Sequence, residues 1–390
     1  MADRIHDFTE KLRQPAVLPN VVAMIERQRT GQAAPHGPIS INLDLTTACN
    51  YECDHCIDLE ILNNGRPYDL AVMVSSLEVL RAAGLESVIL IGGGEPTLHP
   101  GFGAVVEHAK RLGLSCGIVS NGSRNDRIRA VSHLLTKPDW IRLSLDSGTD
   151  ETFQLMHRPR RPISLAAICA GVRPIKEANP DVPVGFSFII SWADPLHLLG
   201  KPIHENVDEI VLATRLARDS GFDYISFKPL LQRDPAGAET VRFPGGARGL
   251  ELRERIQAQL TEAMSLATSA FAVVGSTNLR AIEDEGALRT QPNRCYMHLM
   301  RQVLTPQGVF GCPAYRGNPR DKLGAADSYA TEAGLAAMAG NAVRHMESFD
   351  PSVECRNISC IYSGTNWWLD GLASGAVAPV PSKVETDFFL

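Results

Sequence analysis

Short β-branched stretches alternate with amphipathic helical stretches from about residue 38 onwards, and this alternation limits the possible folds more than any other feature. The stretches that read as strands are 39–45, 87–92, 115–120, 140–145, 184–190 and 224–230. Helical patterns lie between them, for example at 69–83, 101–112, 164–178 and 205–220. Nearly continuous apolar strands joined by helices indicate a parallel sheet that is covered by helices. The sequence therefore predicts an α/β fold whose six strand–helix units suit a partial (β/α)6 barrel better than an open sheet.

The remaining segments are predicted to flank this barrel, which spans residues 38–232. Residues 1–37 read as a mixed, partly helical N-terminal prefix, and residues 233–289 read as a connecting helical region that begins with a Pro- and Gly-rich break. Residues 290–370 contain four cysteines and the hairpin-like segment VLTPQGVFGCP, which together predict a small α+β module. Residues 371–390 are rich in Pro and small residues and predict a tail without regular structure up to its apolar end.

Composition excludes several classes of partner. The 390-residue chain has a net charge of −6, and its Lys and Arg residues are scattered, so we expect no nucleic-acid partner. No apolar run approaches the ~20 residues of a membrane helix, and the polar start MADRIHDFTEKLRQ lacks the apolar centre of a signal peptide. These features predict no membrane partner and a cytoplasmic location. In that compartment the nine cysteines are expected to be metal ligands or core residues rather than disulfides.

Polar or Gly-rich motifs follow four successive predicted strands. They are Cys49–Cys56 (CNYECDHC), Gly92–Pro96 (GGGEP), Ser120–Gly122 (SNG) and Ser144–Gly148 (SLDSG). The loops at the carboxyl ends of parallel barrel strands share one mouth, where the active site of such barrels lies. We therefore expect these four motifs to line one pocket.

The first motif contains three cysteines, Cys49, Cys53 and Cys56, separated by three and two residues. One interpretation is a zinc site that takes His55 as its fourth ligand, which would be closed and chemically inert. The other is a [4Fe–4S] cluster with three thiolate ligands, whose fourth iron stays open to a substrate. The spacing of the cysteines alone leaves both interpretations open.

The pair of motifs, CxxxCxxC after the first strand and GGGEP after the second, resembles the radical SAM superfamily over roughly residues 38–232. The resemblance implies a radical SAM barrel in which the open iron binds S-adenosylmethionine (SAM). It also implies an electron donor such as flavodoxin or ferredoxin. Reductive cleavage of SAM then gives methionine and a 5′-deoxyadenosyl radical, which removes one hydrogen atom from the substrate.

The resemblance also implies which residues contact SAM: His55, Gly92, Gly93, Gly94, Glu95, Asn121, Ser144 and Arg158. The glycines would let the backbone approach the methionine moiety, and Glu95 or neighbouring carbonyls would accept from its ammonium group. Ser144 and Arg158 resemble the positions that hold its carboxylate. Asn121 resembles the position that contacts the ribose, and His55 stands where an aromatic residue commonly lies beside the adenine.

Simpler interpretations exist for most of these residues. Arg158 lies within MHRPRR, which reads equally as a solvated charge run, and Arg160 and Arg161 compete with it for the same role. Gly92–Gly94 and the Asn121-Gly122 pair are also common turn signals, and Ser144 suits a barrel-lining hydroxyl. The two isolated cysteines, Cys116 in a strand and Cys169 in an apolar helix face, are expected to be buried core thiols.

The second cysteine set consists of Cys295, Cys312, Cys355 and Cys360. Four thiols suit one closed site, either zinc or a fully ligated [4Fe–4S] cluster. A cysteine, a hairpin with a second cysteine and two late cysteines resemble the Twitch and SPASM extensions of radical SAM enzymes. SPASM modules hold two clusters, so four cysteines fit the Twitch type with one auxiliary [4Fe–4S] cluster better. The wide last gap, CRNISC, leaves room for zinc.

These features predict a radical SAM oxidoreductase that acts on a small polar molecule, such as a carbohydrate, aminocyclitol or nucleoside-like substrate. The auxiliary cluster would accept an electron from the substrate radical, or would be structural or relay electrons to the first cluster. Candidates for contact with substrate are His157, Arg158, Lys228 and Tyr315, and all of these except Arg158 are also candidate catalytic residues. His157 and Lys228 read equally well as ordinary pocket-rim residues. Residues 1–37 are too short for the peptide-recognition module that many peptide-modifying relatives carry before the barrel.

Two further functions stay open at this point. One is a maturase that epimerises or cross-links a ribosomally made peptide, and the other is a zinc-bearing binding protein. Dehydrogenation, dehydration, epimerisation and decarboxylation all begin with the same hydrogen abstraction. The sequence therefore does not choose among them.

Overall fold

The structure is a computed structural model that describes residues 7–30, 36–65, 67–193, 203–233, 239–284, 286 and 288–390. Parts of the predicted prefix and connecting region, among them residues 1–6, 31–35 and 234–238, lie outside the described residues. The chain forms two compact units. The first unit consists mainly of Cys49–Glu60 and Ile118–Ala287, and the second unit consists of Asp7–Ala48, Ile61–Gly117 and Leu288–Leu390.

The second unit contains a parallel sheet that the C-terminal part of the chain extends. Strands β1 (Ser40–Leu43) and β2 (Ser87–Leu90) run parallel and are buried along their whole length. Strand β10 (Arg301–Thr305) pairs parallel with the other edge of β1. Strand β11 (Gly308–Phe310) pairs antiparallel with β10, which confirms the predicted hairpin. Strand β12 (Lys322–Gly324) pairs antiparallel with β11. A strand from the predicted C-terminal module thus continues the sheet that carries the first motif.

The first unit contains four parallel strands that pair in sequence order. They are β4 (Trp140–Ser144), β5 (Val184–Ile190), β6 (Tyr224–Pro229) and β9 (Ala272–Gly275). Strand β9 was not predicted, because the short run AVVG lies in a region that otherwise reads as helical. Strand β3 (Ser115–Ser120) contains the boundary between the units, and β7 (Gln232–Arg233) and β8 (Glu239–Thr240) form a separate pair. All six predicted strands are present, so the α/β fold with a parallel sheet is confirmed.

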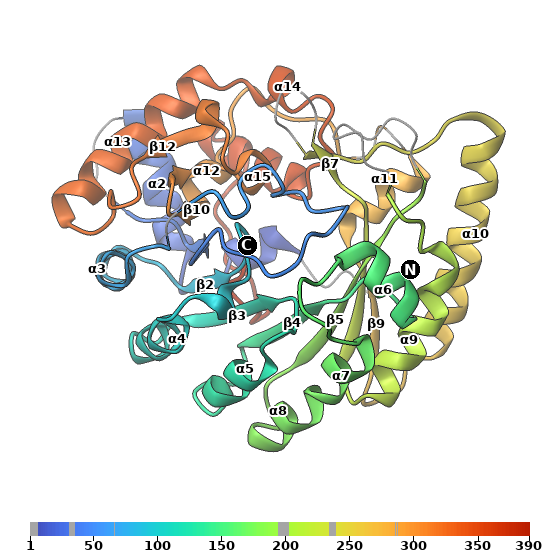
Figure 1. Ribbon diagram of the computed structural model, residues 1–390. Coiled ribbons are helices and arrows are strands. Elements are labelled where there is room, and N and C mark those ends of the chain that lie inside the picture. The colour runs from blue at the N-terminus through green and yellow to red at the C-terminus, as the bar shows by residue number, and fades with distance from the viewer. Residues whose placement is uncertain are drawn as a thin grey trace. The chain divides into compact units, whose positions relative to one another are not determined.

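Helices connect and cover the strands of the first unit, and Figure 1 shows α7, α8 and α9 outside the strands β4 to β6 that they connect. The helices of this unit are α5 (Asn125–Ser132), α6 (Asp150–His157), α7 (Leu165–Ala170), α8 (Val172–Ala178), η2 (Val207–Glu209), α9 (Ile210–Asp219), α10 (Gly246–Ser265), η3 (Thr277–Leu279) and α11 (Arg280–Glu283). The predicted helix 164–178 is broken at Gly171, where a Cβ would lie 2.6 Å from Nδ2 of Asn125. Pro174 in α8 lacks the N–H that would donate to the Ala170 carbonyl, so the segment divides here into α7 and α8.

The second unit has helices at both ends of the chain. They are α1 (Phe8–Leu12), α2 (Leu18–Thr30), α3 (Leu70–Ala82), η1 (Pro96–Leu98), α4 (Phe102–Arg111), α12 (Met297–Met300), η4 (Pro313–Tyr315), η5 (Pro319–Asp321), α13 (Glu332–Ser348), α14 (Pro351–Glu354) and α15 (Ser363–Ser374). The side chains of Asp69 and Thr331 accept backbone N–H groups at the starts of α3 and α13, which satisfies donors that have no partner within the helix. The predicted partly helical prefix is confirmed for its described residues.

Helix α15 extends to Ser374, into the predicted tail at 371–390, and the described residues that follow it, 375–390, form no helix or strand. The apolar end of the tail is buried. Phe389 and Leu390 are each only 3% exposed. The Lys11 ammonium group donates to Asp387 at 2.6 Å and to the Phe389 carbonyl at 2.8 Å, and the Ser87 hydroxyl donates to the Phe388 carbonyl at 2.8 Å. The last residues of the chain therefore pack against α1 and the start of β2.

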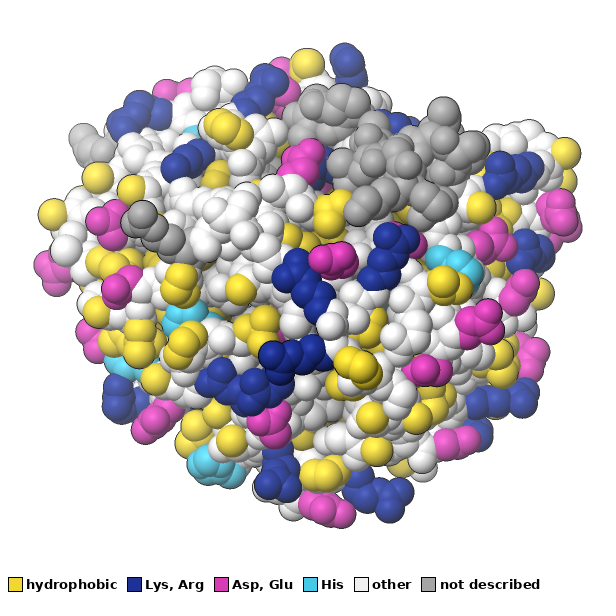
Figure 2. Space-filling model, in the orientation of Figure 1, with side chains coloured by type: hydrophobic (Ala, Val, Ile, Leu, Met, Phe, Trp, Pro, Cys, Tyr) yellow, Lys and Arg dark blue, Asp and Glu magenta, His cyan; other side chains and the backbone are white. Residues whose placement is uncertain are grey.

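On the face drawn in Figure 2, acidic and basic side chains are interspersed among polar and apolar ones. Among the described residues, no helix combines the length and the apolar character that crossing a membrane requires.

Candidate functional site

The loop that carries the first three cysteines is bound to the end of helix α6 in the first unit. Backbone N–H groups of Glu52 and Asp54 donate to the carbonyls of His157 and Met156, at 3.1 and 3.0 Å. Just after α6, the Arg160 N–H donates to the Asn50 carbonyl of the cysteine loop at 3.0 Å. These hydrogen bonds hold the cysteine loop against the residues that end α6.

The structure brings the three cysteines of this loop together. Cys49, Cys53 and Cys56 are all half-buried. Burial raises the pKa of the Cys53 thiol well above its ordinary value, and the neighbouring sulfurs of Cys56 and Cys49 raise it further. Three thiolates this close would repel one another unless a cationic centre bound them, and a bound metal deprotonates its thiols outright. The donor set and its crowding therefore fit an iron–sulfur cluster with three cysteine ligands.

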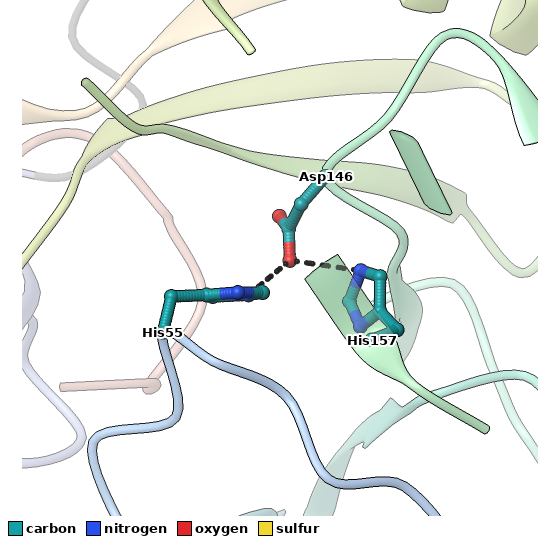
Figure 3. A group of neighbouring side chains, drawn as sticks. All are labelled: His55, Asp146 and His157. Atoms are coloured by element: carbon teal, nitrogen blue, oxygen red, sulfur yellow. Dashed lines mark hydrogen bonds and ion pairs between the residues drawn. The ribbon is translucent and has the colours of Figure 1, made fainter. Parts of the chain in front are cut away.

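A carboxylate lies between two histidines, His55 and His157, as Figure 3 shows, and this group adjoins Cys53. The Asp146 Oδ2 atom is 3.1 Å from Nε2 of His55 and 3.4 Å from Nε2 of His157. The other ring nitrogen of His157, Nδ1, lies 3.2 Å from the Cys53 sulfur, and the other nitrogen of His55 contacts Asp54 Oδ1 at 3.0 Å. The shortest contact of His157 Nε2 is with the Leu145 carbonyl, at 2.9 Å, so His157 connects Cys53 with this carbonyl and, less closely, with Asp146.

Burial and these contacts give the two histidines different charge states. Burial alone would lower the pKa of His55, but its hydrogen bonds to Asp146 and Asp54 outweigh this effect and raise the pKa to about 9. Burial lowers the pKa of His157 to about 4, and the attraction of Asp146 only partly opposes it. Burial also disfavours the ionised form of Asp146, yet the contact with His55 holds its pKa below the ordinary value. His55 is therefore a cation between two anions, while His157 is neutral.

Asp146 owes its position to an unusual backbone conformation after strand β4. Its φ angle is 50°, which non-glycine residues seldom adopt. The conformation is held from both sides, because Oδ1 accepts the Ile189 N–H at 2.6 Å and the backbone carbonyl accepts from the Asn206 amide at 2.7 Å. Such local strain persists only where surrounding contacts maintain it, and it is common at functional sites.

The other predicted residues of the first unit are placed as follows. The Asn121 amide donates to Asn50 Oδ1 at 2.9 Å, so it contacts the cysteine loop. Ser144 ends β4 and Lys228 lies near the end of β6, and both side chains are half-buried. Arg158 is exposed, has a left-handed φ of 44°, and donates to the Leu155 carbonyl. Its assignment as the carboxylate clamp stays a prediction.

Arg160, one of the two competing arginines, pairs with Glu52 at 3.0 Å, and both side chains are about half exposed. The isolated cysteines behave as expected. Cys116 and Cys169 are buried in the core, with exposed fractions of 0% and 2%.

The glycine-rich motif belongs to the second unit, where its backbone conformation and packing both require glycine. Gly92 and Gly93 have φ angles of 77° and 65°. A Cβ on Gly94 would overlap the carbonyl oxygen of Ala48. The Glu95 N–H donates to that same carbonyl at 2.9 Å. The glycines are thus more than a turn signal, since they let this loop pack against the backbone that precedes Cys49.

Glu95 is buried, with 2% of its surface exposed, and one of its oxygens already has partners. Its Oε1 atom accepts the Thr97 N–H at 3.1 Å and the Thr97 hydroxyl at 2.5 Å, so Glu95 caps helix η1. This contact positions the carboxylate at the end of the loop. Its predicted role as an acceptor for the methionine ammonium group stays a prediction.

The structure also brings the second cysteine set together. Cys295 precedes α12, Cys312 follows β11, Cys355 follows α14 and Cys360 precedes α15. Burial raises the pKa of Cys312 well above its ordinary value, and repulsion from Asp321 and from the three other thiols raises it further. Four crowded, half-buried thiols from four segments are the donor set of one closed metal site, and they fit either a [4Fe–4S] cluster or zinc.

A second carboxylate between two histidines accompanies these four cysteines, and no sequence motif predicted it. The Asp321 Oδ2 atom accepts the backbone N–H of Cys312 at 2.7 Å, while Oδ1 lies 2.9 Å from Nε2 of His345 and 3.7 Å from Nε2 of His298. Asp321 has no exposed surface. These three residues come from η5, α13 and α12 and share no local pattern that could have revealed them.

Tyr315, predicted as a substrate contact, lies beside this second cysteine group. Its side chain is 2% exposed, and its hydroxyl donates to the Glu354 carbonyl at 3.0 Å. Burial raises the pKa of this hydroxyl, and the nearby Cys355 and Cys312 sulfurs raise it further. The contacts therefore associate Tyr315 with the second cysteine set.

Comparison with known proteins agrees with these features. Residues 43–191 match the family described as the radical SAM superfamily. A nucleotide dehydratase that depends on S-adenosylmethionine, from Thermoplasmatales archaeon (strain ISO4-H5), is 38% identical over 111 residues, which are 28% of this chain and 38% of that protein. The sporulation killing factor maturation protein SkfB of Bacillus subtilis (strain 168) is 27% identical over 240 residues, which are 60% of this chain and 52% of that protein.

The chain thus spans 38% to 52% of the length of these two relatives. Among solved structures, Streptococcus suis SuiB bound to S-adenosylmethionine superposes with a TM-score of 0.55 at 12% identity, and the match covers 81% of this chain and 66% of SuiB. At this identity the similarity shows a shared fold. The family match includes the three-cysteine loop, the glycine loop and the Asp146 turn, and on this basis residues 43–191 are a radical SAM domain.

Proposed function

We propose that the protein is an enzyme that cleaves SAM reductively and removes a hydrogen atom from a small polar substrate, with a nucleotide-like molecule favoured. The observation that carries the proposal is the grouping of Cys49, Cys53 and Cys56 on one loop of a radical SAM domain. Three ligands leave one iron of a [4Fe–4S] cluster without a protein ligand, so that SAM can bind there.

The chain's own residues would divide the work around that cluster. The three cysteines hold it, and the contact of His157 with the Cys53 sulfur adds a polar neighbour that can tune it. The backbone of Gly92–Gly94 and the carboxylate of Glu95 would receive the methionine end of SAM. Asn121, His55, Ser144 and Arg158 remain the proposed contacts for the rest of the SAM molecule.

Cys295, Cys312, Cys355 and Cys360 are proposed to hold an auxiliary [4Fe–4S] cluster. The crowding of four thiols supports one closed site, which offers no open iron to a substrate. The substrate would lose one hydrogen atom to the 5′-deoxyadenosyl radical, then one electron to the protein and one proton to a base. The result is a two-electron oxidation, which would make the protein an oxidoreductase that consumes SAM.

The relatives support two classes of substrate. The nucleotide dehydratase, with 38% identity in the matched segment, favours a nucleotide as substrate and allows dehydration in place of oxidation. The second candidate is modification of a peptide, because SkfB matches a larger share of the chain and is a maturation protein.

One experiment separates these functions. The anaerobically reconstituted protein is incubated with SAM, dithionite and either nucleotides or peptides, each deuterated at carbon. We expect deuterium in 5′-deoxyadenosine from one nucleotide position, and deuterium from a peptide alone would establish the second candidate. Protein that contains zinc instead of iron and sulfide, or that forms no 5′-deoxyadenosine, would contradict the radical SAM reaction itself.

A further inference from the structure

Arg316 is a buried arginine four residues after Cys312, in the segment that leaves helix η4. Its side chain is 6% exposed, and its Nε atom lies 3.1 Å from Oδ2 of Asp44, a carboxylate that is 1% exposed. Asp44 directly follows strand β1, and its N–H donates to the Leu304 carbonyl of the neighbouring strand β10 at 2.8 Å. The ion pair therefore connects the segment that carries Cys312 with the end of strand β1, which leads into the cysteine loop.

The glycine loop packs directly on this pair. A Cβ on Gly92 would overlap the Arg316 guanidinium group, and a Cβ on Gly93 would lie 3.0 Å from Asp44 Oδ2. Both glycines have positive φ angles, so their conformation and their lack of a side chain serve the same contact. The planar guanidinium group covers the backbone of one glycine, while its counter-ion lies beside the next.

We propose that Arg316 and Asp44 are positioning residues that hold Gly92–Gly94 in the conformation that receives SAM. This inference rests on the proposed function only where it assigns SAM to the glycine loop. The segment that carries Cys312 then contributes to the SAM site, although it lies outside the radical SAM domain at 43–191. A conformational change in the segment that carries Cys312 would be transmitted to the SAM site through the Arg316 side chain.

The chemistry of the pair explains why other side chains would serve poorly. A guanidinium group is flat, keeps its charge and can stack on a peptide plane, whereas a lysine ammonium group is a compact point charge. Removal of one member would leave the other as an uncompensated buried charge, which is strongly unfavourable. We therefore expect loss of the arginine to release the loop, with partial rescue by lysine.

Arg320 offers a matched control in the same segment. It lies four residues further on, its side chain is 55% exposed, and its partner is Glu354 rather than the glycine loop. Four variants are prepared, and their iron content is checked against the wild type: Arg316→Met, Arg316→Lys, Asp44→Asn and Arg320→Met. Hydrogen exchange of peptides that cover residues 88–98 is measured without SAM, and SAM affinity is measured on the reconstituted protein.

We expect faster exchange at the glycine loop in Arg316→Met and Asp44→Asn, and SAM affinity weaker by about ten- to a hundredfold. The electron paramagnetic resonance signal of the reduced first cluster should change less on SAM addition in these variants than in the wild type. Arg316→Lys should fall between the wild type and Arg316→Met, and Arg320→Met should match the wild type.

Loop exchange and SAM affinity in Arg316→Met equal to those of Arg320→Met would overturn the inference. If Arg316→Met does not fold, the near-isosteric Asp44→Asn decides by the same measurements. A wild-type protein with four irons at the first site that binds no SAM would contradict the proposed function. The exchange data would still decide whether the pair holds the loop.

Discussion

The two cysteine groups each adjoin a buried carboxylate between two histidines. A histidine contacts the cysteine in one group, and the carboxylate contacts the cysteine in the other. At the three-cysteine loop, Asp146 contacts His157, and His157 contacts the sulfur of Cys53. At the four-cysteine group, Asp321 itself accepts the backbone N–H of Cys312, and His345 lies on the far side of the carboxylate. In the first case the His157 side chain contacts a cysteine sulfur. In the second case the Asp321 side chain contacts the backbone of a cysteine.

The charge states differ in the same way. The contact with His55 holds the pKa of Asp146 below its ordinary value despite burial, whereas burial raises the pKa of Asp321 despite its contact with His345. Burial lowers the pKa of His298 to about 3, so this histidine is neutral, while His55 at about 9 is charged. The neighbours of the three-cysteine group thus include the charged His55, whereas burial disfavours the charged forms of both His298 and Asp321 beside the four-cysteine group.

This difference suits two different roles. Hydrogen bonds and charges near cluster sulfurs shift reduction potential, and residues behind the ligands orient them. A direct contact at Cys53 would tune the proposed cluster that delivers an electron to SAM. A carboxylate on the Cys312 backbone would mainly fix the position of a proposed ligand in a closed site.

Replacement of Cys49, Cys53 and Cys56 by Ala should abolish SAM cleavage under dithionite, because no open iron remains. Iron analysis should show a loss of about four irons per chain, and the remaining iron should still give a [4Fe–4S] spectrum. Cleavage that persists in this variant would show that the two cysteine groups are not divided as proposed.

Replacement of Cys312 and Cys360 by Ala should remove the auxiliary cluster while SAM cleavage continues. Formation of 5′-deoxyadenosine and the yield of oxidised product are measured in the same reaction, and only the second should disappear. A product isomeric with the substrate, with SAM regenerated by the wild type, would instead mean that the auxiliary cluster does not take part in an oxidation.

Much of the fold could be predicted, because parallel buried strands and their helices leave local patterns in the sequence. The three-cysteine loop and the glycine loop could also be predicted, since each is one continuous motif. Strand β10 beside β1 could not, because its pairing joins residues 40 and 301 and depends on tertiary contact. The predicted domain boundaries at 37, 232, 289 and 370 remain predictions.

The residues that surround the cysteines were harder to identify. His157 was a candidate, but as a substrate contact, and only the structure places it against the Cys53 sulfur. Asp321 and His345 are separated by 24 residues, and Arg316 and Asp44 by 272, so no spacing rule connects them. Such partners are defined by the packing of distant segments, whereas metal ligands on one loop are defined by spacing.

His157→Leu and His345→Leu form a matched pair that compares direct and indirect contact with a cysteine. Loss of a side chain next to a metal ligand commonly costs about 10- to 100-fold in metal affinity or activity. We expect His157→Leu to lose iron from the first site faster in the presence of a chelator and to shift the reduction potential of that cluster. His345→Leu should leave the first site unchanged and weaken the auxiliary site less. Equal effects of the two variants, each at its own site, would remove the distinction between the groups.

The smallest effects are expected from replacing each carboxylate by its amide. In Asp146→Asn, His55 loses a charged hydrogen-bond partner, which should lower the free energy of unfolding of the metal-free, reduced protein by about 1.5–3 kcal/mol. In Asp321→Asn, the amide oxygen can still accept the Cys312 N–H, and the amide nitrogen can donate to His345. Because both contacts survive, and because burial already disfavours the charge of Asp321, the loss should be about 1 kcal/mol or less. Denaturant unfolding under reducing conditions measures both values, and a larger loss for Asp321→Asn than for Asp146→Asn would contradict this difference between the two carboxylates.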